Sequence, residues 1–125
     1  MKLVDTTVAV DHLRGAPAAT AMLTGLIADG ETLVASEVTR FELLAGVRKA
    51  ELEGLEAFFS SLAWAPIDEE VSRTAGTLAQ RLRRSHGGID DADYLIAATA
   101  MVFQADLLTT NVRHFPMIEG LQSPY

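Results

Sequence analysis

The sequence GGIDDADYLIAATA at residues 87–100 gathers negative charge where a hydrophobic helix is expected to begin. Asp90, Asp91 and Asp93 lie close together, and the run that follows is apolar through Phe103. One carboxylate can cap the exposed backbone N–H groups of a helix start and interacts well with the positive end of the helix dipole. Three carboxylates repel one another, and a divalent cation would hold them together. This stretch alone leaves both interpretations open, a helix cap and a metal site.

The composition indicates one domain that needs no covalent crosslinks. The 125 residues are 49% hydrophobic and include no cysteine, which excludes thiolate zinc sites, thiol nucleophiles and redox motifs. Asp5 precedes any signal-peptide core, and no stretch approaches the roughly 20 apolar residues that span a bilayer, so we expect a cytoplasmic protein without membrane contact. The net charge of −7 argues against a broad basic surface for nucleic acid, although a local site where acids hold divalent cations stays possible.

Apolar runs and helical periodicity predict strands that alternate with helices. Strands are expected over 3–4, 32–35, 64–67 and 107–109, with a further edge strand over 120–122. Helices are expected over 8–13, 16–29, 37–49, 51–62, 68–84 and 90–103. Strands and helices in this order predict a single domain over 1–125, folded as a three-layer α/β/α sandwich with a mainly parallel central sheet.

Two of these helices carry features that need an explanation. In the helix over 37–49 we expect Val38, Phe41, Leu44, Ala45 and Val47 to face inward. Glu42 lies at the margin of that face, where a salt bridge or a role in binding metal or water would account for a carboxylate equally well. In the next helix Phe58 and Phe59 are adjacent and cannot both point the same way, so we expect part of the face from Leu52 to Leu62 to contact another protein.

Oxygen-bearing side chains are expected to meet at one edge of the sheet. Asp5 follows the first strand and Asn111 the strand over 107–109, while Asp93 lies at the start of a helix between them. Ligand clefts of open α/β sheets lie at the carboxyl ends of the strands, and Glu42 could reach the same cleft. Such a set suits Mg²⁺ or Mn²⁺, although for Asp5 taken alone an N-cap is the better explanation.

Four segments together resemble PIN-domain ribonucleases, and more closely the VapC-type toxins of type II toxin–antitoxin pairs. The segments are 1–7, an apolar run followed by Asp-Thr-Thr; 39–43, TRFEL; 93–100, DYLIAATA; and 108–115, LTTNVRHF. The resemblance covers essentially the whole chain in the expected order, and 93–100 is its most specific part. It implies a PIN-like fold and a metal-dependent endoribonuclease that hydrolyses RNA phosphodiester bonds.

Carried over residue by residue, the resemblance implies that Asp5, Glu42 and Asp93 are acidic metal-site residues. Asp5 and Asp93 would hold Mg²⁺ or Mn²⁺, while Glu42 would orient or deprotonate the attacking water. Asn111 stands where many members carry a fourth acid, which puts a second metal ion in doubt. The family also implies supporting roles for the hydroxyl groups of Thr6 and Thr109. Within the opening stretch, Asp93 is then the expected ligand and Asp90 the cap, and Asp91 stays unassigned.

The same resemblance implies an RNA substrate, a VapB-like antitoxin that covers the cleft, and a homodimer. Arg113, Arg81 and Arg84 are candidates for contact with RNA phosphate, although the end of a helix explains the last two better than a dedicated RNA patch does. The three histidines, His12, His86 and His114, form no ligand pair at metal spacing, and we expect them to be structural or surface residues. The alternative function is a PIN-like module that has lost cleavage, of which Asn111 would be a symptom, and that acts only by binding.

Overall fold

Four short parallel strands form the centre of the molecule, in the order β3-β2-β1-β4. The computed structural model describes all residues from Met1 to Tyr125. The strands are β1 (Lys2–Val4), β2 (Leu33–Ser36), β3 (Ala63–Ala65) and β4 (Asp106–Leu108). The helices are α1 (Thr6–Leu13), α2 (Pro17–Ala28), α3 (Glu37–Gly46), α4 (Leu52–Phe59), α5 (Glu69–Leu82) and α6 (Asp91–Phe103), with two 3₁₀ turns, η1 (Lys49–Glu51) and η2 (Val112–His114).

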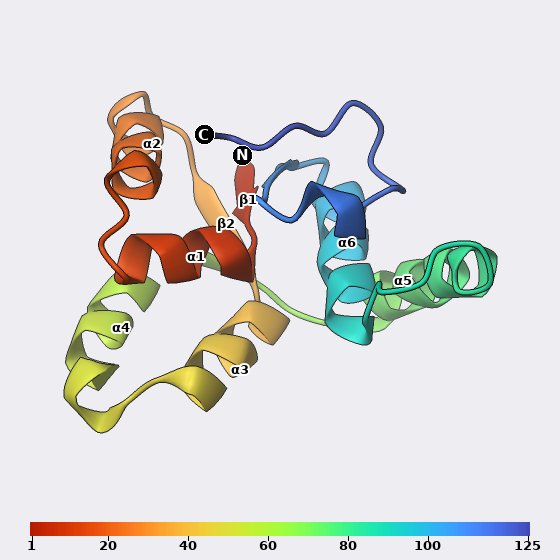
Figure 1. Cartoon of the computed structure of the whole chain (residues 1–125), viewed down its shortest axis with the longest axis horizontal. Coiled ribbons are helices and arrows are strands. Elements are labelled where there is room, and N and C mark those ends of the chain that lie inside the picture. Colours follow the sequence, from red (N-terminus) through yellow and green to blue (C-terminus); the bar gives the residue numbers. More distant parts are fainter.

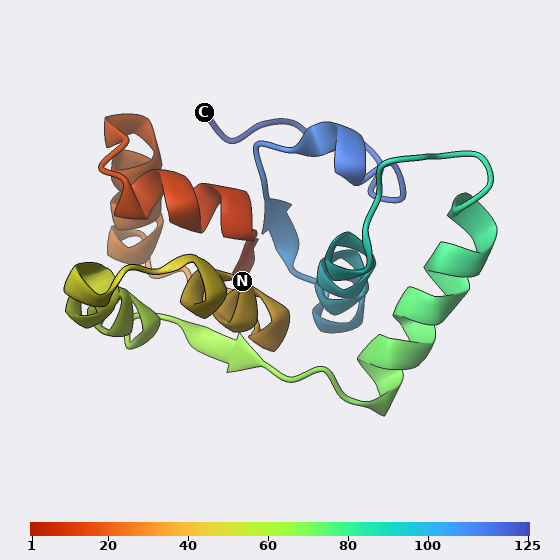
Figure 2. The ribbon, with the colours of Figure 1, turned by 60° about the horizontal axis from the view of Figure 1, so that its bottom comes forward.

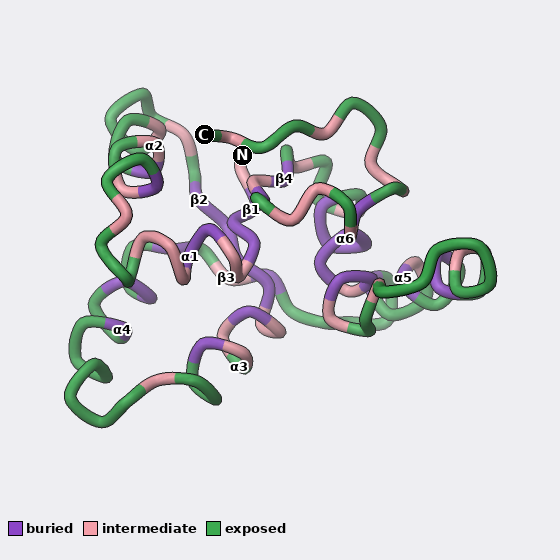
Figure 3. Tube along the Cα trace, in the orientation of Figure 1, coloured by how far each residue is buried: buried purple, intermediate pink, exposed green.

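Helices cover both faces of the sheet because successive strand residues point to opposite sides. Leu3 belongs to an apolar cluster with residues of α5 and α6, whereas Val4 belongs to a second cluster with residues of α1, α2 and α4. Figure 1 shows α1, α2 and α4 on one side of the strands and α5 and α6 on the other, and Figure 3 shows the buried strands between them. The predicted three-layer sandwich with a parallel sheet is confirmed.

The parallel strands bring three polar positions to one edge of the sheet. Asp5 directly follows β1, Ser36 ends β2, and Thr109 directly follows β4. The backbone N–H of Asp5 donates a 3.0 Å hydrogen bond to the carbonyl of Leu108, which fixes the two central strand ends against each other. Ser36 caps α3 through a 3.1 Å hydrogen bond from the backbone N–H of Val38, as its position in the sequence predicts.

The inward face predicted for α3 is wrong in part. Its buried residues are Thr39 and Leu43, whereas Phe41 is 68% exposed and Leu44 is 41% exposed. Phe41, Leu44 and Ala45 face outward, whereas Val38 and Val47 are half-buried against the apolar clusters as predicted. The fully buried stripe contains Thr39, whose hydroxyl lies 3.1 Å from that of Thr6. The helix also ends at Gly46, earlier than expected, because Val47 is extended before η1 begins.

The predicted partner surface on α4 is wrong for Phe58 and Phe59, which are both buried within the chain, whereas Leu52 on the same helix is 41% exposed. Adjacent helical side chains diverge by about 100°, but α4 lies between two neighbours that accept both rings. Phe58 packs against the ring of His12 at 5.1 Å, and Phe59 meets the ring of Trp64 edge-on at 5.1 Å. Figure 2 shows α4 (yellow-green) below α1 (red), with the chain continuing from α4 into β3.

The edge strand predicted over 120–122 does not form. Gly120 adopts a left-handed conformation with a φ of 73°, and the segment that follows has no regular structure. This segment instead returns across the molecule towards the N-terminus (Figure 1). There the Tyr125 hydroxyl donates a 2.6 Å hydrogen bond to Oδ2 of Asp11 in α1. None of the helices is both long and apolar enough to cross a membrane.

Candidate metal and active site

An acidic cleft of about 420 Å³ opens at the carboxyl edge of the sheet. Its walls come from α1, α3, the start of α6 and the segment after β4. The lining residues are Asp5, Thr6, Thr7, Val10, Asp11, Arg14, Glu42, Asp90, Asp93, Thr110, Asn111 and His114. The structure thus brings together the four residues predicted to form the site, Asp5, Glu42, Asp93 and Asn111.

Asp5 is held by two threonine hydroxyl groups. Oδ2 of Asp5 accepts hydrogen bonds from Oγ1 of Thr109 at 2.7 Å and from Oγ1 of Thr7 at 2.9 Å. The residue is only 3% exposed, and although it occupies the N-cap position of α1, its side chain makes no capping hydrogen bond. Because both donors bind Oδ2, Oδ1 stays available to a ligand in the cleft.

Glu42 is oriented by a hydroxyl group from the opposite wall. Oγ1 of Thr6 donates a 2.7 Å hydrogen bond to Oε1 of Glu42, so the start of α1 fixes a side chain of α3. No salt bridge to Glu42 is formed, although the sequence alone left that explanation open. Oε2 accepts no hydrogen bond from the protein and is the second available oxygen of the cleft.

Asp93 combines a capping contact with burial. The side chain of Asp90 accepts from the backbone N–H of Asp93 at 3.0 Å, and Oδ2 of Asp93 accepts from the backbone N–H of Asp90 at 3.2 Å, which forms a capping box. Burial raises the pKa of Asp93 from 3.8 to about 6, and the hydrogen bond from Asp90 opposes this rise. The predicted capping role of Asp90 is confirmed, while Asp91 forms an exposed ion pair with Arg83.

His114 belongs to the cleft, although the spacing of the three histidines predicted a structural or surface role for it. Its Nδ1 atom lies 3.0 Å from Oδ2 of Asp93 and 2.8 Å from Nδ2 of Asn111. Asn111 and His114 are three positions apart across η2, and residues at this spacing face the same side of a 3₁₀ turn. That spacing is the signal that could have identified His114. The hydroxyl contacts of Thr7 with Asp5 and of Thr39 with Thr6 were likewise not predicted from the sequence.

The three carboxylates fit a hard divalent cation by their donor chemistry. Asp5, Glu42 and Asp93 each use one oxygen in hydrogen bonds within the protein and leave the other free of protein donors. No group of three or more histidine, aspartate and glutamate side chains is close enough to hold an ion. Mg²⁺ is usually bound through only one or two carboxylates together with water molecules, which this arrangement can provide.

The arginines predicted to contact RNA lie outside the cleft. Arg81, Arg84 and Arg113 are exposed, and none of them is among the lining residues. Arg14, which the sequence analysis did not single out, is the only arginine or lysine that lines the cleft. It follows Thr6, Thr7, Val10 and Asp11 along one face of α1, at the spacing of successive helical turns.

A parallel α/β domain with an acidic cleft at the carboxyl edge of its sheet is the architecture of PIN domains, and the chain belongs to this family. The PIN domain family model matches residues 2–120. The chain is 65% identical to ribonuclease VapC19 and 44% identical to ribonuclease VapC10, both from Mycobacterium tuberculosis. The matches cover 100% of this chain in both cases, and 100% and 93% of the two relatives.

A solved structure has the same fold. VapBC2 from Rickettsia felis, crystallised with a DNA fragment from its promoter, superimposes with a TM-score of 0.83 at 25% sequence identity. The superposition covers 96% of this chain and 94% of the matched chain. The fold inferred from the sequence and the fold of this relative therefore agree over almost the whole chain.

Proposed function

We propose that this protein is a metal-dependent endoribonuclease that hydrolyses RNA phosphodiester bonds and acts as the toxin of a type II toxin–antitoxin pair. One observation carries the proposal. Three carboxylates from separate elements line one cleft, and each presents an oxygen free of protein hydrogen bonds. The full-length similarity to a protein named ribonuclease VapC19 supports the reaction and the substrate class.

The cofactor belongs to the class of divalent metal ions on which PIN-domain ribonucleases generally depend. We propose Mg²⁺ or Mn²⁺ for this chain, because the available donors are carboxylate and amide oxygens. Asp5 and Asp93 would hold the ion, with Glu42 beside it. When bound, such an ion supplies positive charge that offsets the charge developing on the phosphate and increases the acidity of water.

The chain's own residues would orient the reactants. Thr109 and Thr7 fix the direction of the Asp5 carboxylate, and Thr6 does the same for Glu42. The free Oε2 of Glu42 is suited to accept a proton from the attacking water. Asn111, where many family members carry an acid, supplies an amide that can orient water or RNA and leaves the cleft with one negative charge fewer.

We propose a VapB-like antitoxin as the protein partner and a homodimer as the assembled form. The toxin–antitoxin family supports both, and the VapBC2 likeness supports the first. Phe41, Leu44 and Leu52 are exposed apolar side chains of α3 and α4, and they replace Phe59 as our candidates for a contact surface. An RNA substrate and the absence of cysteine fit a cytoplasmic location.

RNA cleavage by antitoxin-free protein tests the proposed function. Wild type should cut RNA with Mg²⁺ or Mn²⁺ and stop cutting in EDTA, and Asp93→Asn should be inactive under both conditions. Asp91→Asn is the matched control because Asp91 is an exposed neighbour outside the cleft lining. If the metal-replete wild type cuts no RNA and binds no divalent ion, the proposed endoribonuclease activity is wrong. The alternative function, a PIN-like module that acts only by binding, would then be supported. If the wild type does cut RNA, sequencing of the RNA ends identifies the cleaved sequence and position.

A further inference from the structure

A second hollow, of about 620 Å³, adjoins the acidic cleft between α1, α3 and α4. We call it the side groove, and it is lined by Val10, Leu13, Arg14, Glu42, Leu43, Gly46, Val47, Arg48, Ala50, Glu51, Gly54 and Leu55. Val10, Arg14 and Glu42 line both hollows, so the side groove is continuous with the cleft that holds the carboxylates. Each volume lies within the about 300–1,000 Å³ typical of ligand sites.

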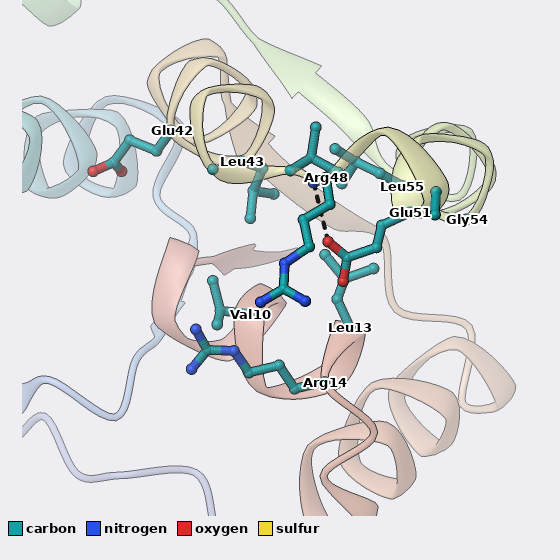
Figure 4. Close-up of a pocket in the computed structure, with 12 residues that line it drawn as sticks. Val10, Leu13, Arg14, Glu42, Leu43, Arg48, Glu51, Gly54 and Leu55 are labelled. Atoms are coloured by element: carbon teal, nitrogen blue, oxygen red, sulfur yellow. Dashed lines mark hydrogen bonds between the residues drawn. The ribbon is translucent and has the colours of Figure 1, made fainter.

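Two arginines supply the positive charge of the side groove. Arg14 ends α1 and Arg48 follows α3, and Figure 4 shows both side chains extending into the space between these helices. Neither guanidinium has a carboxylate within salt-bridge distance, whereas Arg40, Arg73 and Arg83 are each paired. An arginine guanidinium is planar and matches the geometry of phosphate oxygens. Two arginines in one groove, neither of them in a salt bridge, are therefore suited to contact phosphate groups.

The two glutamates of the side groove form no ion pair with these arginines. The Glu42 carboxylate accepts a hydrogen bond from Thr6 and points away from Arg48 in Figure 4. Oε1 of Glu51 accepts a 3.0 Å hydrogen bond from the backbone N–H of Arg48, and no oxygen of Glu51 lies within 4.0 Å of a guanidinium nitrogen, the distance that would define a salt bridge. Both arginines therefore keep their donors free for an anion.

We infer that the side groove binds a stretch of the RNA strand next to the cleavage point, with Arg14 and Arg48 on its backbone phosphates. The inference rests on the proposed function, because it assigns the groove to the same RNA. The two guanidinium groups without an ion-pair partner and the continuity of the groove with the acidic cleft favour RNA over a peptide. The strand also needs such contacts, because the cleft itself carries five acids and Arg14 is its only arginine or lysine. Leu13, which is 38% exposed, is an apolar side chain of the groove lining against which a ribose can pack.

RNA binding measured in EDTA tests this inference separately from cleavage. Fluorescence anisotropy of a labelled single-stranded RNA at several salt concentrations gives the slope of log affinity against log salt. This slope changes by about 0.7 for each phosphate contact on single strands. Arg14→Ala and Arg48→Ala should each weaken binding roughly 10-fold and make the slope shallower by about 0.7, and the double variant should show both effects. Arg14→Lys and Arg48→Lys, which keep the charge, should retain most of the wild-type slope.

Arg73→Ala is the matched control, since Arg73 pairs with Glu69 on the exposed face of α5. It should bind RNA like wild type. In cleavage assays Arg48→Ala should raise KM with little change in kcat, because Arg48 lies outside the acidic cleft. A folded double variant with the wild-type salt slope would overturn the inference. So would variants that lose affinity for antitoxin only, which would assign the groove to protein. If wild type binds RNA with the predicted slopes but does not cut it, the cleavage proposal fails while the groove assignment stands.

Discussion

The hydroxyl of Thr109 donates a 2.7 Å hydrogen bond to Oδ2 of Asp5 and joins the residues that follow the neighbouring strands β4 and β1. Both residues are buried, so the contact is shielded from water. Oγ1 of Thr109 also accepts a 2.9 Å hydrogen bond from the backbone N–H of Asn111. A single buried hydroxyl therefore orients the carboxylate on one wall of the cleft and the backbone of the residue that carries the amide on the other.

Replacing Thr109 by valine should damage the cleft while preserving the shape of the core. Asp5 would lose one of its two hydroxyl donors, and we expect the free energy of unfolding to fall by about 1.5–3 kcal/mol. Loss of a residue that orients a metal ligand should reduce kcat/KM for RNA about 10- to 100-fold. Thr99→Val is the control, since the buried hydroxyl of Thr99 bonds only to the carbonyl of Leu95 within α6. Equal activity of both variants would show that the hydrogen bond to Asp5 has no role in the site.

Asp93 should make the metal-free protein less stable as the pH rises from about 4 to about 6. Burial raises its pKa from 3.8 to about 6 in the folded protein, so in this range the folded state binds a proton that the unfolded state has released. The free energy of unfolding therefore falls across this window, by up to about 3 kcal/mol, and the loss is complete above it. Asp93→Asn removes the titration, and in EDTA at pH 7 it should be more stable than wild type.

Urea unfolding of both proteins in EDTA at several pH values measures this difference directly. Asp91→Asn is again the control, because Asp91 is exposed and should change the pH profile little. The comparison subtracts the contributions of all other titrating groups shared by the two proteins. Parallel stability curves for wild type and Asp93→Asn would contradict the raised pKa.

The acidic residues of the cleft could be predicted because their positions follow from local sequence and from strand order. Asp5 comes directly after an apolar run, and Asp93 comes at the start of a helix, so a parallel sheet brings them to one edge. Thr39 and His114 could not be placed in this way. The contact of Thr39 with Thr6 depends on how α3 packs against α1, and the contact of His114 with Asp93 depends on how η2 packs against α6. Local spacing relates His114 only to Asn111.

The same limitation explains the errors in α3 and α4. Apolar spacing predicted that Phe41 faces the core, but the buried stripe contains Thr39, a polar residue whose hydroxyl lies next to that of Thr6. The sequence also predicted that part of the α4 face contacts another protein, because the adjacent Phe58 and Phe59 cannot point the same way. Burial of both rings requires His12, which comes from a distant part of the chain, on one side and Trp64, which follows shortly after α4 in β3, on the other.

Divalent ions should stabilise the folded protein if Asp5 and Asp93 bind one. A ligand that binds only the folded state adds about 2.7 kcal/mol to the free energy of unfolding at 100 times its Kd. The Tm should therefore rise with Mn²⁺ or Mg²⁺ concentration at pH 7, and rise less at pH 5, where Asp93 is protonated and binds cations poorly. Asp5→Asn should reduce the Tm increase, whereas Asp106→Asn, which affects an exposed ion pair with Lys2 outside the cleft, should not. A metal-independent Tm would contradict the assigned ligands.

Substitutions of Phe59 and Phe41 should separate the stability of the core from assembly. Phe59 is 3% exposed and packs against Trp64, so Phe59→Ser should lower the free energy of unfolding by about 3–5 kcal/mol. Phe41 is 68% exposed, and Phe41→Ser should change that free energy by less than about 0.5 kcal/mol. If the outer face of α3 is the contact surface, Phe41→Ser should still weaken self-association or antitoxin binding, measured by light scattering and by calorimetry. A folded Phe41→Ser variant with wild-type assembly and antitoxin affinity would show that the outer face of α3 is not the partner surface.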